Sequence, residues 1–572
     1  MAGLSGRLRR PPERRLLDWG LPFLLALLLL GPLLLGRGYA LVGDMVFVPD
    51  QPWKPRWVGA DGSVPRAVPS DAVTWLLGTA LPGDLVQKLL LLATVVLAGA
   101  GAAALTRTCS APARAVAIVL MVWNPYVHER LAIGHWALLM GYAMLPWVAV
   151  GARRLRQGEP GAWRAVVWPL AVAAWTSPTG GVLAALVLLA SVAPRPRVLL
   201  RTCALALAVN LPWLVPGVVN ASSAPADPFG VQAFAARADS PWGVVGSVLG
   251  LGGIWKESVA VDVRGSALLS GLSVVLTLVA LSGLLMLRRR DPASATPLLV
   301  LAVLGFALAL LPVTGAGERV AEGLVTTIPG GGILRDSQKW VALALPGLCW
   351  GAAVAADAVG AWVRRRGGSA TTVLLAAWAA LPVLLLPTTA WGLSGTLSPH
   401  AYPAEWHEAR SRLAAAGAAD DRSVVLPFGL YRRFDWNGGH AVLDPAPRFF
   451  PGDVVTDDAL AVTGGTVAGE DPLADEIRAA VDDPARLTQV LREAGVRWVI
   501  AHADGGEVDA VLPEGEPVHH GERLVVLELT GIHPRGEQRQ EWLVTLDLVV
   551  LVVIGAQLLP WERIRRYSRR RE

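Results

Sequence analysis

Apolar runs of about 20 residues recur along the whole chain, with short polar segments between them. A helix of that length crosses the hydrocarbon core of a bilayer, so each run predicts a membrane span. The run near 114–124 is short, and a break at 177–181 divides one long apolar stretch into two. Twelve spans are predicted, near 18–36, 85–105, 114–124, 135–152, on either side of 177–181, and near 199–218, 267–287, 296–312, 340–360, 370–392 and 541–560.

Arginine clusters give the predicted spans an orientation. They lie at 14–15, 153–156, 288–290, 364–366 and 563–571, always on the same side if the chain crosses twelve times. Short loops rich in Arg stay in the cytoplasm, which predicts that both chain ends lie there. The first run is too long for a signal peptide and lacks a small-residue cleavage site, so an uncleaved first helix is expected.

The same orientation places four long segments outside the membrane. In the last of them, the spacing of Val496, Trp498 and Ile500 at every second position is that of a strand, and Ser423–Phe428 and Leu524–Leu529 are further strand candidates. The segment Arg486–Ala494 is expected to be helical, with its apolar residues on one face, and Ser70–Leu81 an amphipathic helix on the membrane surface. The four outer segments are 37–83, 219–265, 313–338 and 393–540.

These patterns predict a polytopic α-helical membrane protein of about twelve transmembrane helices with an extracytoplasmic mixed α/β domain. The expected division is a membrane module at 1–392, the outer domain at 393–540, and a last helix with a basic cytoplasmic tail at 541–572.

Composition agrees with a protein solvated mostly by lipid. Charged residues make up 17% of the 572 residues, against about 25% in soluble proteins. The net charge of +5 does not indicate a nucleic-acid partner, because the arginines cluster between apolar runs, where they face anionic lipid. Only four residues are lysine, and this bias towards Arg, with abundant Ala and Gly, is typical of a GC-rich bacterial genome. The lysines, Lys54, Lys88, Lys256 and Lys339, all fall outside or at the outer edge of the membrane.

The first outer loop carries two candidate carboxylates, Asp44 and Asp50. Asp44 follows the first span closely and lies in an apolar stretch, where a carboxyl group tends to have a raised pKa that suits a general base. The ordinary alternative is that Asp44 caps a turn and Asp50 opens a Pro-rich loop, and residue type alone favours it.

The second outer loop gathers His128, Glu129, Arg130 and His135 at a helix boundary. Ionisable residues at this depth are functional by default. His128 and Glu129 are suited to bind a divalent cation or to orient an acceptor, and Arg130 to meet a phosphate. The alternative, equally weighted, is an interfacial anchor in which Arg130 and neighbouring aromatic residues belong to the membrane belt. No cofactor is indicated with certainty.

A third cluster precedes the tenth predicted span. Arg335 and Lys339 are four residues apart, so on a helix both face one way, and they lie outside against the usual charge bias. A lipid phosphate at the helix N-terminus is the natural partner. The alternatives are an ordinary headgroup contact or a pair between Arg335 and Asp336.

These clusters and the topology resemble the GT-C superfamily of membrane glycosyltransferases. The nearest resemblance is to actinobacterial arabinofuranosyltransferase-like members and the related YfhO-like membrane proteins. It covers most of the membrane region through loose motifs, which are NPYVHERLAIGHW at 124–136, LPW at 145–147, LRDSQKW at 334–340 and LPFGLYRRFDWNGGHAVLDPAPRFF at 426–450.

The resemblance implies a hexosyl- or pentosyltransferase. A sugar would move from a polyprenyl-phosphate donor to a cell-envelope glycan or glycolipid acceptor on the outer face. Asp44 would be the base, with Asp50 as the alternative, and Arg130, Arg335 and Lys339 would hold the leaving phosphate. The adjacent acidic pair of some members is absent, since the two aspartates are six residues apart.

The resemblance also assigns acceptor binding to the outer domain, where Trp406, Tyr431 and Trp436 are candidates for stacking on sugars, with a place in the domain core as the alternative. Two other functions compete with glycosyl transfer. A lipid or glycan transporter or flippase would show inverted repeats and charges in mid-helix, and neither pattern is clear. A non-catalytic relative that scaffolds envelope assembly would be favoured if Asp44 pointed away from any cavity.

Overall fold

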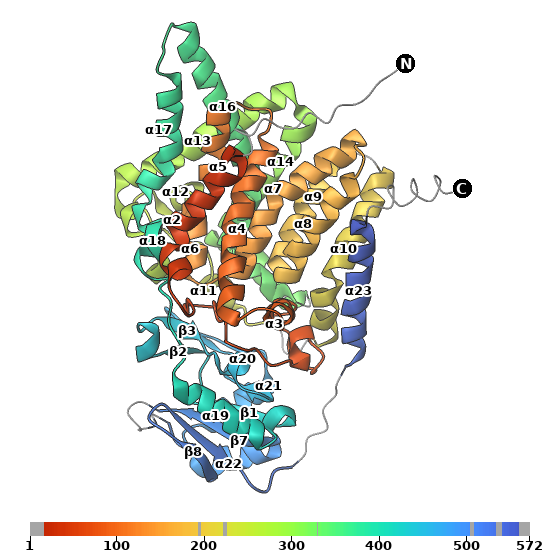
Figure 1. The fold of residues 1–572 in the computed structure, drawn as a ribbon, viewed down its shortest axis with the longest axis vertical. Coiled ribbons are helices and arrows are strands. Elements are labelled where there is room, and N and C mark those ends of the chain that lie inside the picture. The colour runs from red at the N-terminus through yellow and green to blue at the C-terminus, as the bar shows by residue number, and fades with distance from the viewer. Residues whose placement is uncertain are drawn as a thin grey trace, which may run out of the picture.

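Long helices form one part of the molecule and a sheet-containing domain forms the other (Figure 1). The computed structural model describes residues 16–192, 196–220, 226–328, 330–503, 508, 510–533 and 540–559. The basic N-terminal residues 14–15 and the tail 563–571, both used above to orient the chain, lie outside the described residues.

Helices occupy all twelve segments expected to span the membrane. Among the described residues six helices are long and apolar enough to cross a bilayer, or seven if α17 and its bent continuation, residues 387–394, count as one span. A membrane protein is thus supported, while the number of twelve spans stays a prediction. The helices are α2 (Leu21–Leu35), α4 (Gly83–Leu105), α5 (Ala111–Val122), α7 (Trp136–Gln157), α8 (Ala162–Thr176), α9 (Pro178–Val192), α10 (Pro196–Val219), α13 (Ala267–Arg290), α14 (Pro292–Leu310), α16 (Leu345–Arg365), α17 (Thr371–Leu385) and α23 (Trp542–Leu558).

Small residues let several of these helices approach closely. A Cβ atom added at Gly283 of α13 would lie 2.0 Å from the carbonyl oxygen of Gly351 in α16, and one at Gly141 of α7 would lie 2.5 Å from the Cα of Gly180 in α9. Packing through small residues is how membrane helices associate without a hydrophobic driving force. The break between α8 and α9 falls at Ser177, whose extended backbone is expected of a residue before proline.

The turn between α16 and α17 lies at the end of the bundle opposite the sheet domain (Figure 1). Arg364 and Arg365 are in the last turn of α16 and Arg366 follows them. A basic turn at the far end from the sheet domain agrees with the predicted orientation, which has this domain outside.

The connections near the sheet domain contain short helices, namely α3 (Ser70–Gly78), α6 (Pro125–Ala132), α11 (Phe229–Ala233), α12 (Gly243–Leu249), α15 (Gly315–Thr327) and α18 (Ala390–Ser394). The helix α3 confirms the amphipathic helix expected near 70–81. It buries its polar residues Asp71 and Thr74 against the protein and leaves Leu76 56% exposed, so its apolar face points outwards. A seven-residue 3-10 helix, η7 (Gln338–Ala344), leads into α16.

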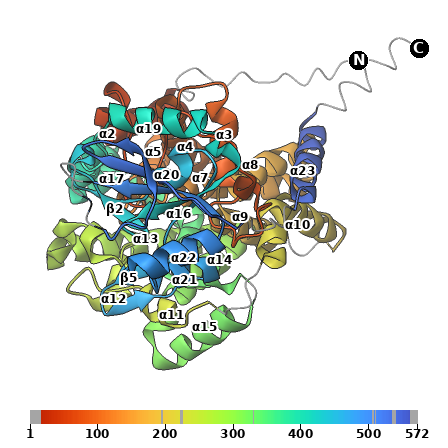
Figure 2. The ribbon, with the colours of Figure 1, turned by 90° about the horizontal axis from the view of Figure 1, so that it is seen from below.

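The sheet domain has the mixed α/β structure expected for it. Its main sheet has five strands in the order β4-β1-β7-β9-β8, with β1 parallel to β4 and β7, and β9 antiparallel to β7 and β8. The expected helix at 486–494 is α22 (Pro484–Glu493). The strands are β1 (Arg422–Leu426), β4 (Asp453–Val455), β7 (Val496–His502), β8 (Glu516–His520) and β9 (Leu524–Glu528), and the other helices are α19 (Ala404–Ala415), α20 (Ala446–Phe449) and α21 (Pro472–Arg478). Seen from below, α19, α20 and α22 cover the ends of the bundle helices (Figure 2).

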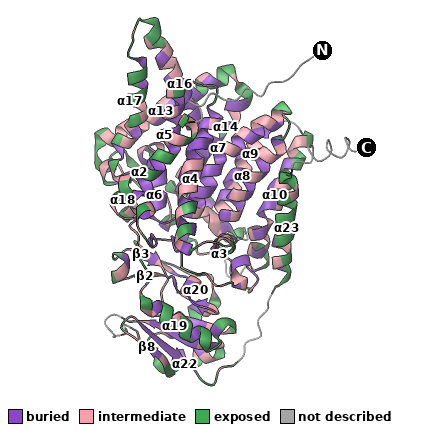
Figure 3. Cartoon of the chain, viewed as in Figure 1, coloured by how far each residue is buried: buried purple, intermediate pink, exposed green. Residues whose placement is uncertain are grey.

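An aromatic cluster fills the side of this domain that faces the bundle. Trp406 is fully buried there, and its ring centroid lies 5.6 Å from that of Tyr402, 5.1 Å from that of Phe449 and 5.4 Å from that of Phe450. Purple, buried residues run from the centre of the bundle into this domain (Figure 3). The two parts therefore share one continuous apolar core.

A small hairpin attaches the domain to the first outer loop. Its strands are β2 (Tyr431–Arg433) and β3 (Ala441–Leu443). The backbone N–H of Gly43 donates to the carbonyl of Ala441, and the N–H of Leu443 donates to the carbonyl of Gly43, both at 2.8 Å. The loop after α2 therefore lies beside β3 like a third short strand, which fixes the neighbouring Asp44 against the outer domain.

Candidate active site

Asp44 lies where the helical bundle, the second outer loop and the sheet domain meet. Its Oδ1 accepts a hydrogen bond from the Tyr431 hydroxyl, and its Oδ2 lies 3.2 Å from Nε2 of His135. The Asp44 side chain is 41% exposed, so a face of the carboxylate stays open. The ammonium of Lys256 lies 5.9 Å from the centre of the Tyr431 ring and adds a positive charge beside the acid.

Two glycines bring the backbone of Asp44 against the second outer loop. The N–H of Asp44 donates to the carbonyl of Ile133 at 2.9 Å. A Cβ atom at Gly43 would lie 2.0 Å from that same oxygen, and one at Gly134, whose φ is +85°, would lie 2.4 Å from the nitrogen of Met45. Only glycine fits at either position, because any side chain would collide with the facing backbone.

Arg130 organises the groups behind Asp44. Its side chain is fully buried, and it forms a two-point ion pair with Asp336, in which Nη2 lies 2.9 Å from Oδ1. Nε and Nη2 also donate to Oε1 of Gln338, and Nη1 contacts Nδ1 of His135 at 3.0 Å. A guanidinium has five N–H groups, and all five are engaged in these contacts.

The contact with Arg130 fixes the tautomer of His135. A guanidinium only donates, so Nδ1 of His135 accepts and carries no hydrogen. The hydrogen of the neutral ring is therefore on Nε2, which donates to Asp44. Arg130 thus orients the hydrogen-bond donor that faces the candidate base.

The pKa of Asp44 is lowered, which corrects the expectation of a raised value. Burial alone would raise it, but the hydrogen bonds from His135 and Tyr431 and the charge of Lys256 outweigh that effect. Asp44 is therefore ionised at neutral pH and ready to accept a proton. The pKa of Lys256 is also lowered, by burial first and by nearby Arg433, while Asp44 acts in the opposite sense.

In the cluster at 335–339, Asp336 bonds to Arg130, whereas Arg335 and Lys339 bond to other groups. Asp336 pairs with Arg130, not with Arg335. Arg335 turns towards the outer domain, where its Nη2 lies 3.3 Å from Oε1 of Glu470. Lys339 is 6% exposed and donates to the carbonyl of Ile333. The 335–339 segment and Asp44 are thus brought into one cluster through Arg130 and His135, with the two basic side chains at its edge.

Of the remaining residues of the second outer loop, His128 points elsewhere and Glu129 joins the Arg130 network through Gln338. Nδ1 of His128 lies 2.9 Å from Oγ1 of Thr389, and Oε2 of the fully buried Glu129 accepts from Nε2 of Gln338 at 3.2 Å. No group of three or more His, Cys, Asp or Glu side chains that could hold a metal ion occurs among the described residues. The mechanism below is therefore derived from the protein side chains alone.

Asp50 lies apart from the cluster. Its side chain is 79% exposed and pairs with Arg410 of α19 at 2.9 Å. It touches none of His135, Tyr431 and Lys256, which surround Asp44.

The three aromatic residues proposed to stack on sugars have different surroundings in the structure. Trp406 is fully buried in the aromatic cluster, so it has no face on which a sugar could stack. Trp436 stacks on Phe434, with ring centroids 4.7 Å apart. Only Tyr431 reaches the carboxylate of Asp44, through its hydroxyl.

The loop at 226–265 supplies Lys256, a residue that sequence reasoning did not select. A buried ion pair folds this loop, in which Arg264 donates to both oxygens of Asp239 at 2.7 and 2.9 Å. Arg264 also donates to the carbonyls of Ser247 and Gly250. The rarity of lysine in the chain was the one signal in the sequence that could have singled out Lys256.

Comparison with known proteins identifies the fold. No protein-family model matches the chain, and no curated protein matches it. Among solved structures, the arabinofuranosyltransferase AftD from Mycobacteria superposes with a TM-score of 0.55 at 16% identity, covering 92% of this chain and 40% of that one. A mutant of the same enzyme gives 0.54 at 15% identity, covering 92% and 42%. The oligosaccharyltransferase AglB from Archaeoglobus fulgidus gives 0.41 at 11% identity, covering 84% and 65%.

The chain therefore has a GT-C-like membrane fold, as the sequence resemblance implied. It spans about 40% of the length of the mycobacterial arabinofuranosyltransferase chain that it matches.

Proposed function

We propose that this chain with a GT-C-like fold is a membrane glycosyltransferase that moves a sugar from a polyprenyl-phosphate donor to a cell-envelope glycan or glycolipid. The reaction takes place on the outer face of a bacterial plasma membrane, and both chain ends are cytoplasmic. The basic turn at Arg364–Arg366, at the end of the bundle opposite the sheet domain, supports this orientation.

One observation carries the proposal. A partly exposed, ionised carboxylate, Asp44, is held by His135 and Tyr431 and lies in the field of Lys256, three groups from three different parts of the chain. A carboxylate that only capped a turn would need none of them. Convergence of this kind around an open acid is typical of a catalytic base.

In the proposed reaction Asp44 accepts the proton of an acceptor hydroxyl as that oxygen attacks the anomeric carbon of the donor. The bond between that carbon and the phosphate oxygen breaks, and the phosphate leaves with both bonding electrons. The lowered pKa of Asp44 keeps the base ionised before the reaction. His135 and Tyr431 hold the carboxylate in place by hydrogen bonds, which limits its rotation.

Positive charge is needed at the leaving phosphate, since charge develops there as the bond breaks. Arg130 has no free N–H group to give it, because all five are engaged by protein groups. Lys256, which is only partly buried and whose charge lowers the pKa of Asp44, takes this role, with Arg335 as a second, 23% exposed group. We therefore assign Arg130 to positioning and Lys256 to phosphate binding.

The test is a transfer assay in membrane extracts with labelled polyprenyl-phosphate sugars. Wild type, Asp44→Ala and Asp50→Ala are compared at equal protein levels. The expected result is that Asp44→Ala loses transfer and Asp50→Ala keeps it, since Asp50 lies outside the cluster. Equal transfer by all three proteins would reject the catalytic assignment and leave a non-catalytic protein of the same fold.

A further inference from the structure

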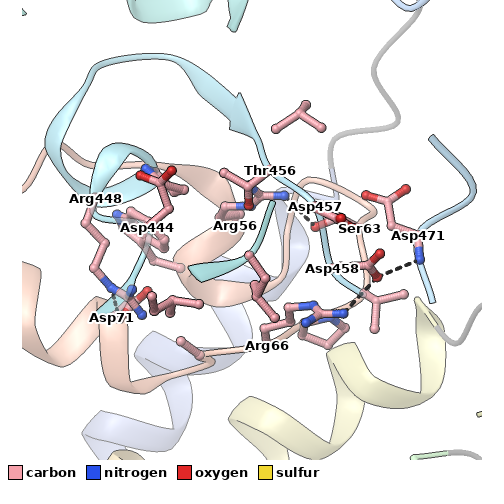
Figure 4. A pocket seen from close by; sticks show the side chains of 18 residues that line it. Arg56, Ser63, Arg66, Asp71, Asp444, Arg448, Thr456, Asp457, Asp458 and Asp471 are labelled. Carbon is pink, nitrogen blue, oxygen red and sulfur yellow. Dashed lines mark hydrogen bonds and ion pairs between the residues drawn. The ribbon is translucent and has the colours of Figure 1, made fainter. Parts of the chain in front are cut away.

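A cavity of about 130 Å³ lies between the first outer loop and the outer domain (Figure 4). A protein cavity of about 150 Å³ can bind benzene, so this one has the scale of a single six-membered or five-membered ring. Three guanidinium groups and five carboxylates line it, among them Arg56, Arg66, Arg448, Asp71, Asp457 and Asp458. Apolar residues such as Val64 and Val455 complete the wall.

The cavity lies beside the hairpin that carries Tyr431 and binds the backbone next to Asp44, although Asp44 itself does not line it. Leu443 lines it, and the backbone N–H of Leu443 donates at 2.8 Å to the carbonyl of Gly43, the residue before Asp44. Leu443 is also the cross-strand partner of Tyr431, so the two side chains project from the same face of the hairpin. The charge of Arg66, another lining residue, acts on the Tyr431 hydroxyl that binds Asp44.

The lining charges are already paired with each other or with the protein. Nε of Arg448 lies 3.1 Å from Asp71, Nη2 of Arg66 lies 2.8 Å from Asp458, and Asp457 accepts from Arg478 at 2.5 Å. Carboxylates outnumber guanidinium groups, which disfavours a phosphate or another anion. The carboxylates are not arranged as a metal site in the described part of the chain, which disfavours a cation.

A neutral polyhydroxylated molecule suits such a wall. Each sugar hydroxyl both donates and accepts, so it can lie between a guanidinium and a carboxylate without disturbing their charge balance. The C–H faces of a sugar ring also find apolar contacts on Val64 and Val455. Ligand sites of this kind combine an apolar surface with a few placed polar groups.

We infer that the cavity lined by Arg66, Ala67 and Thr456 binds one neutral sugar residue of the acceptor glycan and so presents the acceptor hydroxyl to Asp44. This inference rests on the proposed glycosyl transfer. It assigns acceptor recognition to the seam between the first outer loop and the outer domain, instead of to the buried aromatic cluster around Trp406.

Binding is measured by saturation-transfer NMR and titration on the purified full chain in detergent. The probes are a neutral arabinofuranosyl tetrasaccharide and maltotetraose, with inorganic phosphate and Mn²⁺ as charged comparisons. Ala67→Phe fills the cavity without removing a polar group, and Thr456→Val removes one hydroxyl at constant shape. Ala80→Phe, at an exposed position later in the same loop, is the matched control. Thermal unfolding of every variant shows whether it is folded.

We expect at least one neutral oligosaccharide to bind wild type and Ala80→Phe equally, and to bind Ala67→Phe and Thr456→Val about tenfold more weakly. Asp44→Asn should bind it as wild type does while losing transfer, which separates this inference from the proposed function. If neither oligosaccharide binds, if both cavity variants bind as wild type does, or if only phosphate or Mn²⁺ responds to Ala67→Phe, the inference is wrong. A loss of transfer in Asp44→Asn would still support the proposed function in each of those cases.

Discussion

The carboxylate of Asp44 accepts a hydrogen bond from the hydroxyl of Tyr431, which comes 387 residues later in the chain. Asp44 follows the first long helix, and Tyr431 begins the hairpin of the outer domain. The candidate site is therefore built from both parts of the molecule. Residues 1–392, which the sequence predicts to be the membrane module, do not contain the complete set of groups around the base.

Replacing Asp44 by Asn removes the proposed base and keeps the size of the side chain. We expect the initial rate of sugar transfer to fall by about 100- to 10,000-fold, the range that general base catalysis supplies. The measurement is the membrane-extract assay with a labelled polyprenyl-phosphate sugar. Asp50→Asn is the control, since that side chain is 79% exposed and lies outside the cluster. A variant of Asp44 that retains full activity would contradict the mechanism.

Tyr431→Phe removes one hydrogen bond to the base and little else. That hydrogen bond lowers the pKa of Asp44, so its loss raises this pKa. A base with a raised pKa becomes protonated at higher pH as the solution is acidified. The acid limb of the pH–rate profile should therefore move to higher pH. Tyr126→Phe, whose hydroxyl bonds the Lys339 carbonyl, is the control, and the two profiles should differ.

Lys256→Met tests the proposed contact with the leaving phosphate. Loss of one hydrogen bond to a charged group corresponds to roughly a 10- to 100-fold change in binding. We expect the KM for the polyprenyl-phosphate donor to rise by that factor, with kcat falling as well because charge stabilisation is lost. Lys88→Met is the control, since Lys88 pairs with Asp84 in α4. An unchanged KM in Lys256→Met would exclude this residue from the donor site.

Arg130→Met leaves Asp336 as a buried charge without its partner. Breaking one side of a buried pair costs about 3–5 kcal/mol, so the melting temperature in detergent should fall clearly. The double variant Arg130→Met with Asp336→Leu removes both charges and should recover much of that loss. If the double variant is as unstable as the single one, the ion pair is not the source of the effect.

The same ion pair predicts how stability responds to acid. Burial would raise the pKa of Asp336, but Arg130 outweighs burial and lowers it from 3.8 to about 2. A carboxylate with a lowered pKa stabilises the fold above its unfolded pKa of about 4 and loses that effect as the pH falls towards 2. Unfolding measured between pH 5 and pH 2 should show this loss in wild type and not in the double variant.

Trp406→Ala distinguishes a core residue from a sugar-stacking one. Removing a fully buried Trp costs about 3–5 kcal/mol of folding free energy. Trp406→Phe keeps much of the packing, so it should retain both most of the stability and normal binding of neutral oligosaccharides. Loss of oligosaccharide binding in a stably folded Trp406→Phe protein would contradict a core role.

The helices of this fold could be predicted because each depends mainly on the length and apolar character of one continuous segment. Length and apolar composition located the segments that became α2, α4 and α13, and alternation located β7. The cluster of His128 to His135 was found because ionisable residues are unusual at a span boundary. What these residues contact could not be predicted, since that depends on how distant segments pack.

The candidate site shows this limit most clearly. Arg130 was selected as a phosphate ligand by its charge, yet all its donors are used by Asp336, Gln338 and His135. Lys256 was passed over because the fold of its loop depends on the buried pair between Arg264 and Asp239. Coordinates are needed to show which donors of Arg130 are already engaged and where the loop that carries Lys256 lies.

The close approach of the backbone at Gly43 to Ile133, and of that at Gly134 to Met45, has a consequence for the comparison of related sequences. The direction of the base is set by two stretches of main chain lying against each other, with no room for one additional carbon atom at either position. A relative that keeps the aspartate but carries alanine or a larger residue at either glycine would have its acid displaced. Such a chain would look intact in an alignment of acidic residues and yet be inactive, so the two glycines are better markers of a working enzyme than the aspartate alone.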